Sequence, residues 1–210
     1  MIFLNFKTYP ETSGENTLKL CRLIQDKRAI PCLQSVDIYK VKQALPNLEV
    51  WAQHADPFTP GKFTGYQLPF SLKAAGAGGV LLNHSDHPIN IAVLPTTVKY
   101  CREAGLKIMI ITASLEEIKI VSRLQPDFIG FEDPQLIGGS VAMIDANFDL
   151  VKQAAAAAKL PLIVGGGIRS SEHVAKSLQA GGAGVLVASE FAKSTDPVQT
   201  LQNLITGLDR

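Results

Sequence analysis

Short apolar runs alternate with longer helical patterns along the whole chain. Runs such as Val80-Leu-Leu82, Ile108-Met-Ile-Ile111 and Val185-Leu-Val187 do not alternate polar with apolar residues. A strand on a half-exposed sheet alternates in that way. These runs therefore predict strands that are buried on both faces, as in a parallel sheet covered by helices.

The pattern predicts eight strands in 210 residues, or one strand–helix unit per about 26 residues. That spacing is near the short end of what an eight-fold βα barrel needs. No linker or composition break divides the chain, so we expect a single α/β barrel domain over residues 1–210. A doubly wound open sheet is the alternative, although no G-x-G-x-x-G follows the first strand.

The expected strands are Ile2–Phe6, Ala29–Gln34, Leu48–Gln53, Gly79–Asn83, Lys107–Ile111, Phe128–Phe131, Leu162–Val164 and Ala183–Val187. The expected helices include Thr17–Lys27, Leu72–Ala75, Ile91–Ala104, Ser114–Leu124, Asn147–Lys159, Ser171–Gln179 and Pro197–Leu208.

The composition excludes several classes of protein. The formal net charge is +1 without basic or acidic runs, so neither nucleic acid nor a membrane surface is an expected partner. No apolar run approaches the roughly 18 residues of a membrane helix, and the N-terminus lacks the pattern of a secretory signal. Cys21, Cys32 and Cys101 lie far apart, which fits reduced thiols in a cytoplasmic protein better than a disulfide framework or a zinc site.

The sixth expected strand ends at a carboxylate. Phe128–Phe131 is followed by Glu132, and then by a loop that begins near Pro134 and carries two glycines, Gly138 and Gly139. In a barrel enzyme, a carboxylate at the tip of a buried strand, beside a loop that can close over it, is the arrangement of a general base. The alternative is a surface Glu that opens a turn.

Two other strand ends carry polar groups. Alternation along the first strand sends Asn5 and Lys7 to the same side, and the fourth strand leads into His84. In a barrel the carboxyl ends of the strands build the active site, so we expect these side chains to lie near Glu132. Alone, a lysine after an N-terminal strand is usually solvated surface, and His84 could equally be a polar loop residue.

The last two units end in glycine-bearing or small-residue turns, at Val164-Gly-Gly-Gly167 and Val187-Ala-Ser189. Backbone N–H groups at such strand-to-helix turns approach anions closely. Phosphate sites in barrels commonly follow the seventh and eighth strands. The pattern favours a phosphate site over simple turn glycines.

Together these segments resemble the triosephosphate isomerase family, in its compact archaeal-type form, from Asn5 to Ser189. The segments that carry the resemblance are Asn5-Phe-Lys7, Ala52-Gln-His-Ala-Asp-Pro57 with Phe63-Thr-Gly65, Asn83-His-Ser85, Glu132-Asp-Pro-Gln-Leu-Ile-Gly138, Gly165-Gly-Gly167 and Leu186-Val-Ala-Ser189.

The resemblance implies an eight-fold βα (TIM) barrel that interconverts dihydroxyacetone phosphate and D-glyceraldehyde 3-phosphate, a step of glycolysis and gluconeogenesis, without metal or organic cofactor. Glu132 would move the proton through an enediolate. His84 would polarise the carbonyl as a neutral imidazole, with its pKa lowered by a helix N-terminus near Ser85. Lys7, oriented by Asn5, would stabilise the oxyanion.

The resemblance also implies a phosphate site, a lid and a homo-oligomer. The phosphate-binding residues would be Gly138, Gly165, Gly166, Gly167, Ala188 and Ser189. The lid would comprise Asp133, Pro134, Gln135, Leu136, Ile137 and Gly139. The loop around Phe63, Thr64 and Gly65 would reach into a partner subunit of a dimer or tetramer.

The chain departs from the family pattern at Asp86, where Glu is usual, and at Glu190, where Gly is usual. We expect the shorter Asp86 to orient Lys7 less well and Glu190 to point away from the phosphate. Asp133, where many relatives carry Pro, would raise the pKa of Glu132. Two alternatives to an active isomerase follow, namely another sugar-phosphate-binding βα barrel and a catalytically impaired isomerase-like binding protein.

Overall fold

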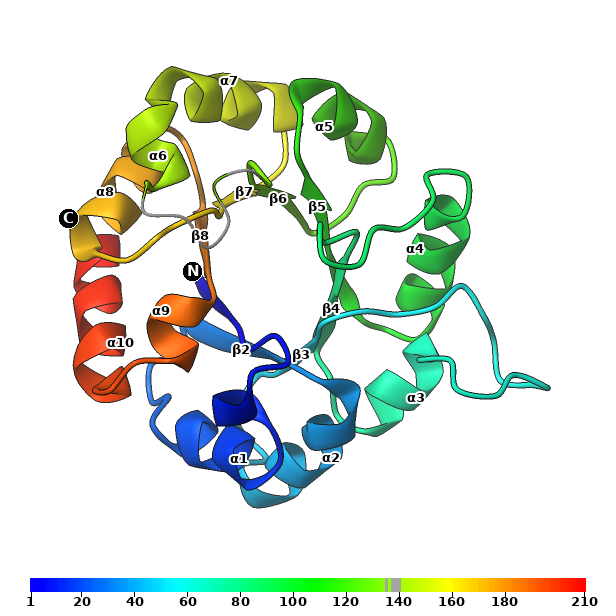
Figure 1. The fold of residues 1–210 in the computed structure, drawn as a ribbon. Helices are drawn as coiled ribbons and strands as arrows, with labels where there is room; N and C mark the ends of the chain where they lie inside the picture. The colour runs from blue at the N-terminus through cyan, green and yellow to red at the C-terminus, as the bar shows by residue number, and fades with distance from the viewer. Residues whose placement is uncertain (135, 137–140) are drawn as a thin grey trace.

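The computed structural model describes residues 1–134, 136 and 141–210. Eight parallel strands, β1 to β8, pair in chain order, and β8 pairs back with β1 to close a barrel. Figure 1 looks along the barrel and shows the helices as an outer ring around the strands. The predicted single α/β barrel is confirmed.

The strands are β1 (Ile2–Asn5), β2 (Ala29–Leu33), β3 (Trp51–Ala52), β4 (Gly79–Leu82), β5 (Lys107–Thr112), β6 (Phe128–Phe131), β7 (Leu162–Val164) and β8 (Gly184–Val187). The α-helices are α1 (Glu15–Arg22), α2 (Ser35–Ala44), α3 (Pro69–Ala74), α4 (Leu94–Glu103), α5 (Leu115–Ser122), α6 (Met143–Ala146), α7 (Phe148–Ala158), α8 (Ser171–Gln179), α9 (Ser189–Ala192) and α10 (Pro197–Thr206). Two short 3₁₀ helices are η1 (Pro10–Thr12) and η2 (Gly207–Asp209).

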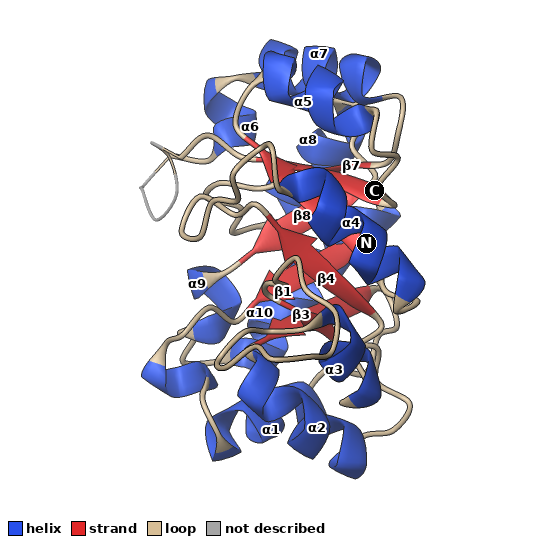
Figure 2. Cartoon of the chain, turned by 90° about the vertical axis from the view of Figure 1, so that its right-hand side faces the viewer, coloured by secondary structure: helices blue, strands red, loops and turns tan. Residues whose placement is uncertain are grey.

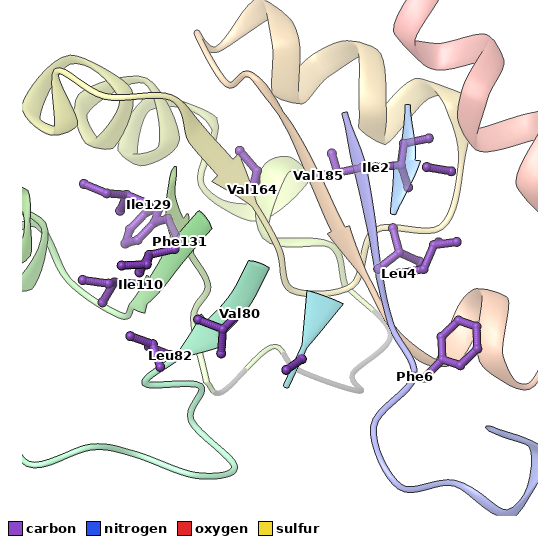
Figure 3. Packing of buried hydrophobic residues seen from close by; sticks show 14 of the residues in the cluster. Ile2, Leu4, Phe6, Val80, Leu82, Ile110, Ile129, Phe131, Val164 and Val185 are labelled. Carbon is purple, nitrogen blue, oxygen red and sulfur yellow. The ribbon is translucent and has the colours of Figure 1, made fainter. Parts of the chain in front are cut away.

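The strands alternate between two buried layers. Phe3, Leu81 and Met109 belong to the cluster that fills the barrel. Their neighbours pack outward against the helices, in the cluster that Figure 3 shows with Ile2, Leu4, Val80, Leu82, Ile110 and Val164 among its labelled members. Both faces of each strand are therefore apolar, which explains why the strand sequences do not alternate.

Aromatic side chains fill part of the barrel interior. Phe3 lies edge-on to Trp51, with ring centroids 5.0 Å apart, and Phe128 packs against both. Gly79 makes room for the indole, since a Cβ at that position would lie 2.3 Å from Trp51. The barrel is thus a packed core rather than a pore, and polar groups collect where the strands end.

The segments that follow the strands share one end of the barrel. In Figure 2, α9, which follows β8, lies on the side opposite the N-terminus. The segment between β3 and α3 projects from the rim (Figure 1) and carries a cluster of Phe58, Phe63 and Tyr66. Among the described residues, no helix is long and apolar enough to cross a membrane.

Candidate active site

Hydrogen bonds hold the backbone of Lys7 in an unusual conformation just after β1. Its φ is +47°, in the left-handed region that costs a non-glycine residue energy. Its N–H donates to Asn5 Oδ1 at 3.0 Å, and Gln53 Nε2 donates to its carbonyl oxygen at 2.9 Å. Asn5 is itself buried, with 6% of its surface exposed. These bonds fix the unusual backbone that directs the lysine.

Lys7 and Asp86 form an ion pair. Lys7 Nζ lies 2.9 Å from Asp86 Oδ2, with 15% of the lysine side chain and 57% of the aspartate side chain exposed. The shorter carboxylate of Asp86 therefore reaches the lysine, and its expected weaker orienting effect stays a prediction.

His84 occupies a defined tautomer at the end of β4. The side chain of Asn83 braces the turn by donating to Ile111 O and accepting from Ile89 N–H, each at 2.9 Å. The backbone N–H of Asp86 donates to His84 Nδ1 at 3.0 Å. Because Nδ1 accepts a hydrogen bond, we assign the proton of the neutral ring to Nε2.

Burial lowers the pKa of His84, Lys7 lowers it further, and Asp86 opposes the shift. A neutral imidazole is therefore favoured, as predicted, but the predicted cause is wrong. Ser85 lies in a turn, and α4 begins only at Leu94. The shift comes from desolvation and a neighbouring cation, not from a helix N-terminus.

Glu132 is a buried carboxylate that faces His84. Its side chain is 8% exposed, and its Oε2 lies 3.4 Å from His84 Nε2 without a hydrogen-bond partner among the described residues. Burial raises the pKa of Glu132 to about 7, with Asp86 adding to the rise, while Lys7 and a backbone hydrogen bond from Gly166 oppose it. The expected contribution of Asp133 is not among these causes. A buried carboxyl with this pKa can both take up and release a proton near neutral pH.

Gly165 makes room for Glu132. A Cβ at this position would lie 2.1 Å from Glu132 Oε1, and the Gly165 N–H already donates to Phe131 O at 2.9 Å. Its prediction as a phosphate ligand is therefore not supported, because the N–H is engaged between β6 and β7. The absence of a side chain at Gly165 instead leaves space for the Glu132 carboxyl group.

One cavity of about 250 Å³ joins the predicted catalytic residues to the predicted phosphate turns. Its lining residues are Asn5, Lys7, His84, Glu132, Gly166, Gly167, Ile168, Arg169, Leu186, Val187, Ala188, Ser189 and Glu190. The structure thus brings together residues from β1, β4, β6, β7 and β8 that the sequence only places at separate strand ends.

The turn after β7 and the start of α9 form the far end of this cavity. Gly166 and Gly167 have φ values of +84° and +75°, which favour glycine. Ala188 precedes α9, where the first N–H groups of a helix lack intrahelical acceptors. Glu190 is half-buried and lines the cavity, although we expected it to point away from the phosphate.

Arg169 also lines the cavity, and the sequence-based reasoning did not select it. The signal that could have identified it is a cation two residues beyond the glycine triplet, at a strand-to-helix turn.

Part of the predicted lid lies within the described chain. Asp133 and Pro134 follow Glu132, and Leu136 N–H donates to Asp133 O at 3.0 Å. Four predicted residues lie outside the described residues, namely Gln135, Ile137, Gly138 and Gly139, so the Gly138 phosphate contact and the lid remain predictions.

The fold and the cavity define a class, a βα barrel with a buried carboxyl that faces an imidazole at the carboxyl ends of its strands. The triosephosphate isomerase family model matches residues 1–119. Triosephosphate isomerases of Methanothermus fervidus and Methanobrevibacter smithii are 35% and 30% identical to the chain, and the alignments cover 98% and 99% of it and 97% and 98% of the relatives. The chain belongs to the triosephosphate isomerase family.

Two further similarities complete the comparison. The crystal structure of triosephosphate isomerase from Bartonella henselae superposes with a TM-score of 0.73 at 20% identity, covering 99% of this chain and 97% of that one, which supports the fold. The Histidine biosynthesis protein family model matches residues 101–207. The C-terminal half, which contains the turns after β7 and β8, is therefore similar to a second family as well.

Proposed function

We propose that the chain interconverts dihydroxyacetone phosphate and D-glyceraldehyde 3-phosphate. The observation that carries the proposal is Glu132, which is buried against His84 in a cavity with Lys7 and has a pKa of about 7. A proton transfer between neighbouring carbons needs one base that can return what it takes, and this carboxyl has the matching acidity.

In the forward step Glu132 takes a proton from the carbon next to the carbonyl. The electron pair of that C–H bond forms the C–C double bond of an enediolate, and negative charge moves to the carbonyl oxygen. His84 Nε2–H donates to that oxygen, and the Lys7 ammonium stabilises the charge. The hydroxyl proton of the first carbon then moves to the former carbonyl oxygen by way of His84 Nε2, which shifts the negative charge to the hydroxyl oxygen. Glu132 returns its proton to the former carbonyl carbon, and the first carbon becomes the new carbonyl.

The phosphate is assigned to the turns after β7 and β8. Gly167, Ala188 and Ser189 line the cavity, and backbone N–H groups at such turns suit a dianion. Gly166 lines the same end, but its N–H serves Glu132 in this structure. Closure of the segment that begins at Asp133 would exclude water from the enediolate.

The similarity of residues 101–207 to the Histidine biosynthesis protein family favours one alternative, a different phosphate-binding barrel. Such a barrel would share the last two turns without needing Lys7, His84 and Glu132 together. A catalytically impaired barrel that retains ligand binding is the other alternative.

A coupled assay with glyceraldehyde 3-phosphate tests the proposal. We expect turnover by the wild type and strong losses in Lys7→Met, His84→Gln and Glu132→Gln. Absence of turnover with intact binding of phosphoglycolate would favour the impaired barrel, and turnover that survives two of these substitutions would contradict the mechanism.

We also propose a homo-oligomer through the loop that contains Phe63, Thr64 and Gly65. Phe63 and Tyr66 are 42% and 51% exposed, which is unusual for clustered aromatic side chains. A second cavity of about 450 Å³ lies beside Lys7, and Val36, 80% exposed, belongs to its lining. The aromatic loop of one subunit would fill the cavity of the next. Light scattering should give a dimer or tetramer, and Phe63→Ser with Tyr66→Ser should reduce the mass to that of a monomer.

A further inference from the structure

A second imidazole lies behind the phosphate end of the cavity, and the proposed reaction does not use it. His173 belongs to α8, and its side chain is 14% exposed. The backbone N–H of Arg169 donates to its Nδ1 at 3.1 Å, and its Nε2 lies 3.0 Å from Asp145 Oδ2.

These contacts define a bridge. A ring that accepts an N–H bond at Nδ1 carries its proton on Nε2, which donates to the carboxylate. Asp145 belongs to α6, and Lys176 Nζ holds its other oxygen at 2.9 Å. His173 therefore links the turn after β7 to a neighbouring helix through two directional hydrogen bonds.

The turn attached in this way is the one that lines the cavity. Gly166, Gly167, Ile168 and Arg169 are all lining residues. Met143, the first residue of α6, donates its N–H to Gly166 O at 2.9 Å. The turn is thus fastened to α6 at both ends, directly at Gly166 and through the imidazole at Arg169.

Glycines at positive φ give the least intrinsic stiffness to a turn, so its shape depends on outside contacts. We propose that His173 is a positioning residue for the phosphate end of the site, which holds the Gly166–Arg169 backbone so that the Gly167 N–H faces the anion. The nature of the ligand rests on the proposed function.

Two substitutions separate the two ends of the bridge. His173→Asn places an amide oxygen near the position of Nδ1, so it keeps an acceptor for Arg169 N–H and loses Asp145. His173→Gln places its amide near the position of Nε2, so it keeps a donor for Asp145 and loses the bond to Arg169. His173→Leu removes both.

The measurements are kcat and KM for glyceraldehyde 3-phosphate, and the dissociation constant of inorganic phosphate. We expect His173→Asn to stay within about twofold of the wild type in all three. His173→Gln and His173→Leu should raise KM and the phosphate dissociation constant about three- to tenfold, as for a lost hydrogen bond, with kcat within about twofold because Lys7, His84 and Glu132 are untouched.

Any other ranking overturns the proposal. Equal weakening in all three variants would assign the effect to general structure, and unchanged phosphate affinity in all three would make the bridge irrelevant to binding. If His173→Leu does not fold, the Asn and Gln variants still decide, since both are polar and close in size. A wild type without turnover would contradict the proposed function, whereas the phosphate constants would still test His173.

Discussion

Two histidine–carboxylate pairs in this barrel make the same kinds of contact, but the pKa values of their carboxyl groups shift in opposite directions. In each, Nδ1 accepts a backbone N–H, from Asp86 at 3.0 Å for His84 and from Arg169 at 3.1 Å for His173. In each, Nε2 faces a carboxylate, Glu132 at 3.4 Å and Asp145 at 3.0 Å. The carboxylates differ in everything else.

Glu132 is buried, and burial raises its pKa to about 7. Asp145 is partly exposed, and hydrogen bonding to Lys176 is the main cause that lowers its pKa. The carboxyl of the first pair can therefore exchange a proton near neutral pH, whereas the carboxylate of the second pair stays ionised and accepts a fixed hydrogen bond. Burial and the number of partners, not the residue types, separate a carboxyl that titrates near neutral pH from one that stays ionised.

The sharpest way to break this comparison is to neutralise each carboxylate. Glu132→Gln should lower kcat about 10²–10⁴-fold, as for loss of a general base, because an amide cannot accept the proton. The matched change Asp145→Asn should cost less than about threefold, because its contact is remote from the reacting carbons. Steady-state kinetics of both variants gives the answer, and similar losses in the two would remove the distinction.

Gly165→Ala disturbs the His84–Glu132 pair without changing its charges. The added Cβ would lie 2.1 Å from Glu132 Oε1 and 2.5 Å from its Cγ, so the carboxylate must move. A displacement near 1 Å can cost about a hundredfold, and we expect a fall of that order in kcat. Circular dichroism and inorganic-phosphate binding serve as controls, since the fold and the phosphate end should persist. Full activity would mean that Glu132 works from another position.

The sequence predicts much of this arrangement, because continuous apolar runs locate most of the strands and therefore their ends. Asn5, Lys7, His84 and Glu132 lie in one cavity at the strand ends, as those runs predict. What the sequence could not supply depends on packing between distant segments. The role of Gly165 comes from the approach of β7 to β6, and the bridge through His173 joins α8, α6 and a turn that are separate in the chain.

The sequence also fails to predict elements that are short or have a weak apolar pattern. The expected helices did not include α2, whose buried residues are only Asp37, Ile38 and Val41. The strand expected over Leu48–Gln53 is reduced to Trp51–Ala52. In contrast, β6 and β7 begin and end at the predicted residues, since both consist of continuous apolar runs.

The pH dependence of the unfolding free energy also distinguishes the two carboxyl groups. The pKa of Glu132 is raised from 4.5 to about 7 on folding, so its contribution to stability is present below pH 4.5 and is lost as the pH rises through 7. Relative to Glu132→Gln, the wild type should lose roughly 2–3 kcal/mol of unfolding free energy between about pH 5 and pH 8.5. Asp145 has a lowered pKa, so Asp145→Asn should diverge from the wild type only in acid. Denaturant unfolding at several pH values measures both, and a pH-independent difference for Glu132→Gln would contradict an ionisable buried carboxyl.

At Asp86 we expect a smaller effect than at Glu132 or Gly165, and the substitution separates the role of the backbone from that of the side chain. Asp86→Ala removes the carboxylate that pairs with Lys7 but keeps the N–H that donates to His84 Nδ1. Because 57% of the Asp86 side chain is exposed, water screens its charge, and kcat should fall less than about tenfold. Asp86 also helps to raise the pKa of Glu132, so the acidic limb of kcat/KM should move to lower pH. A loss of a hundredfold or more would mean that the Asp86 carboxylate, rather than its backbone N–H, holds His84 in the tautomer with the proton on Nε2. The backbone N–H groups of Asp86 and Arg169 would then not play the same role at His84 and His173.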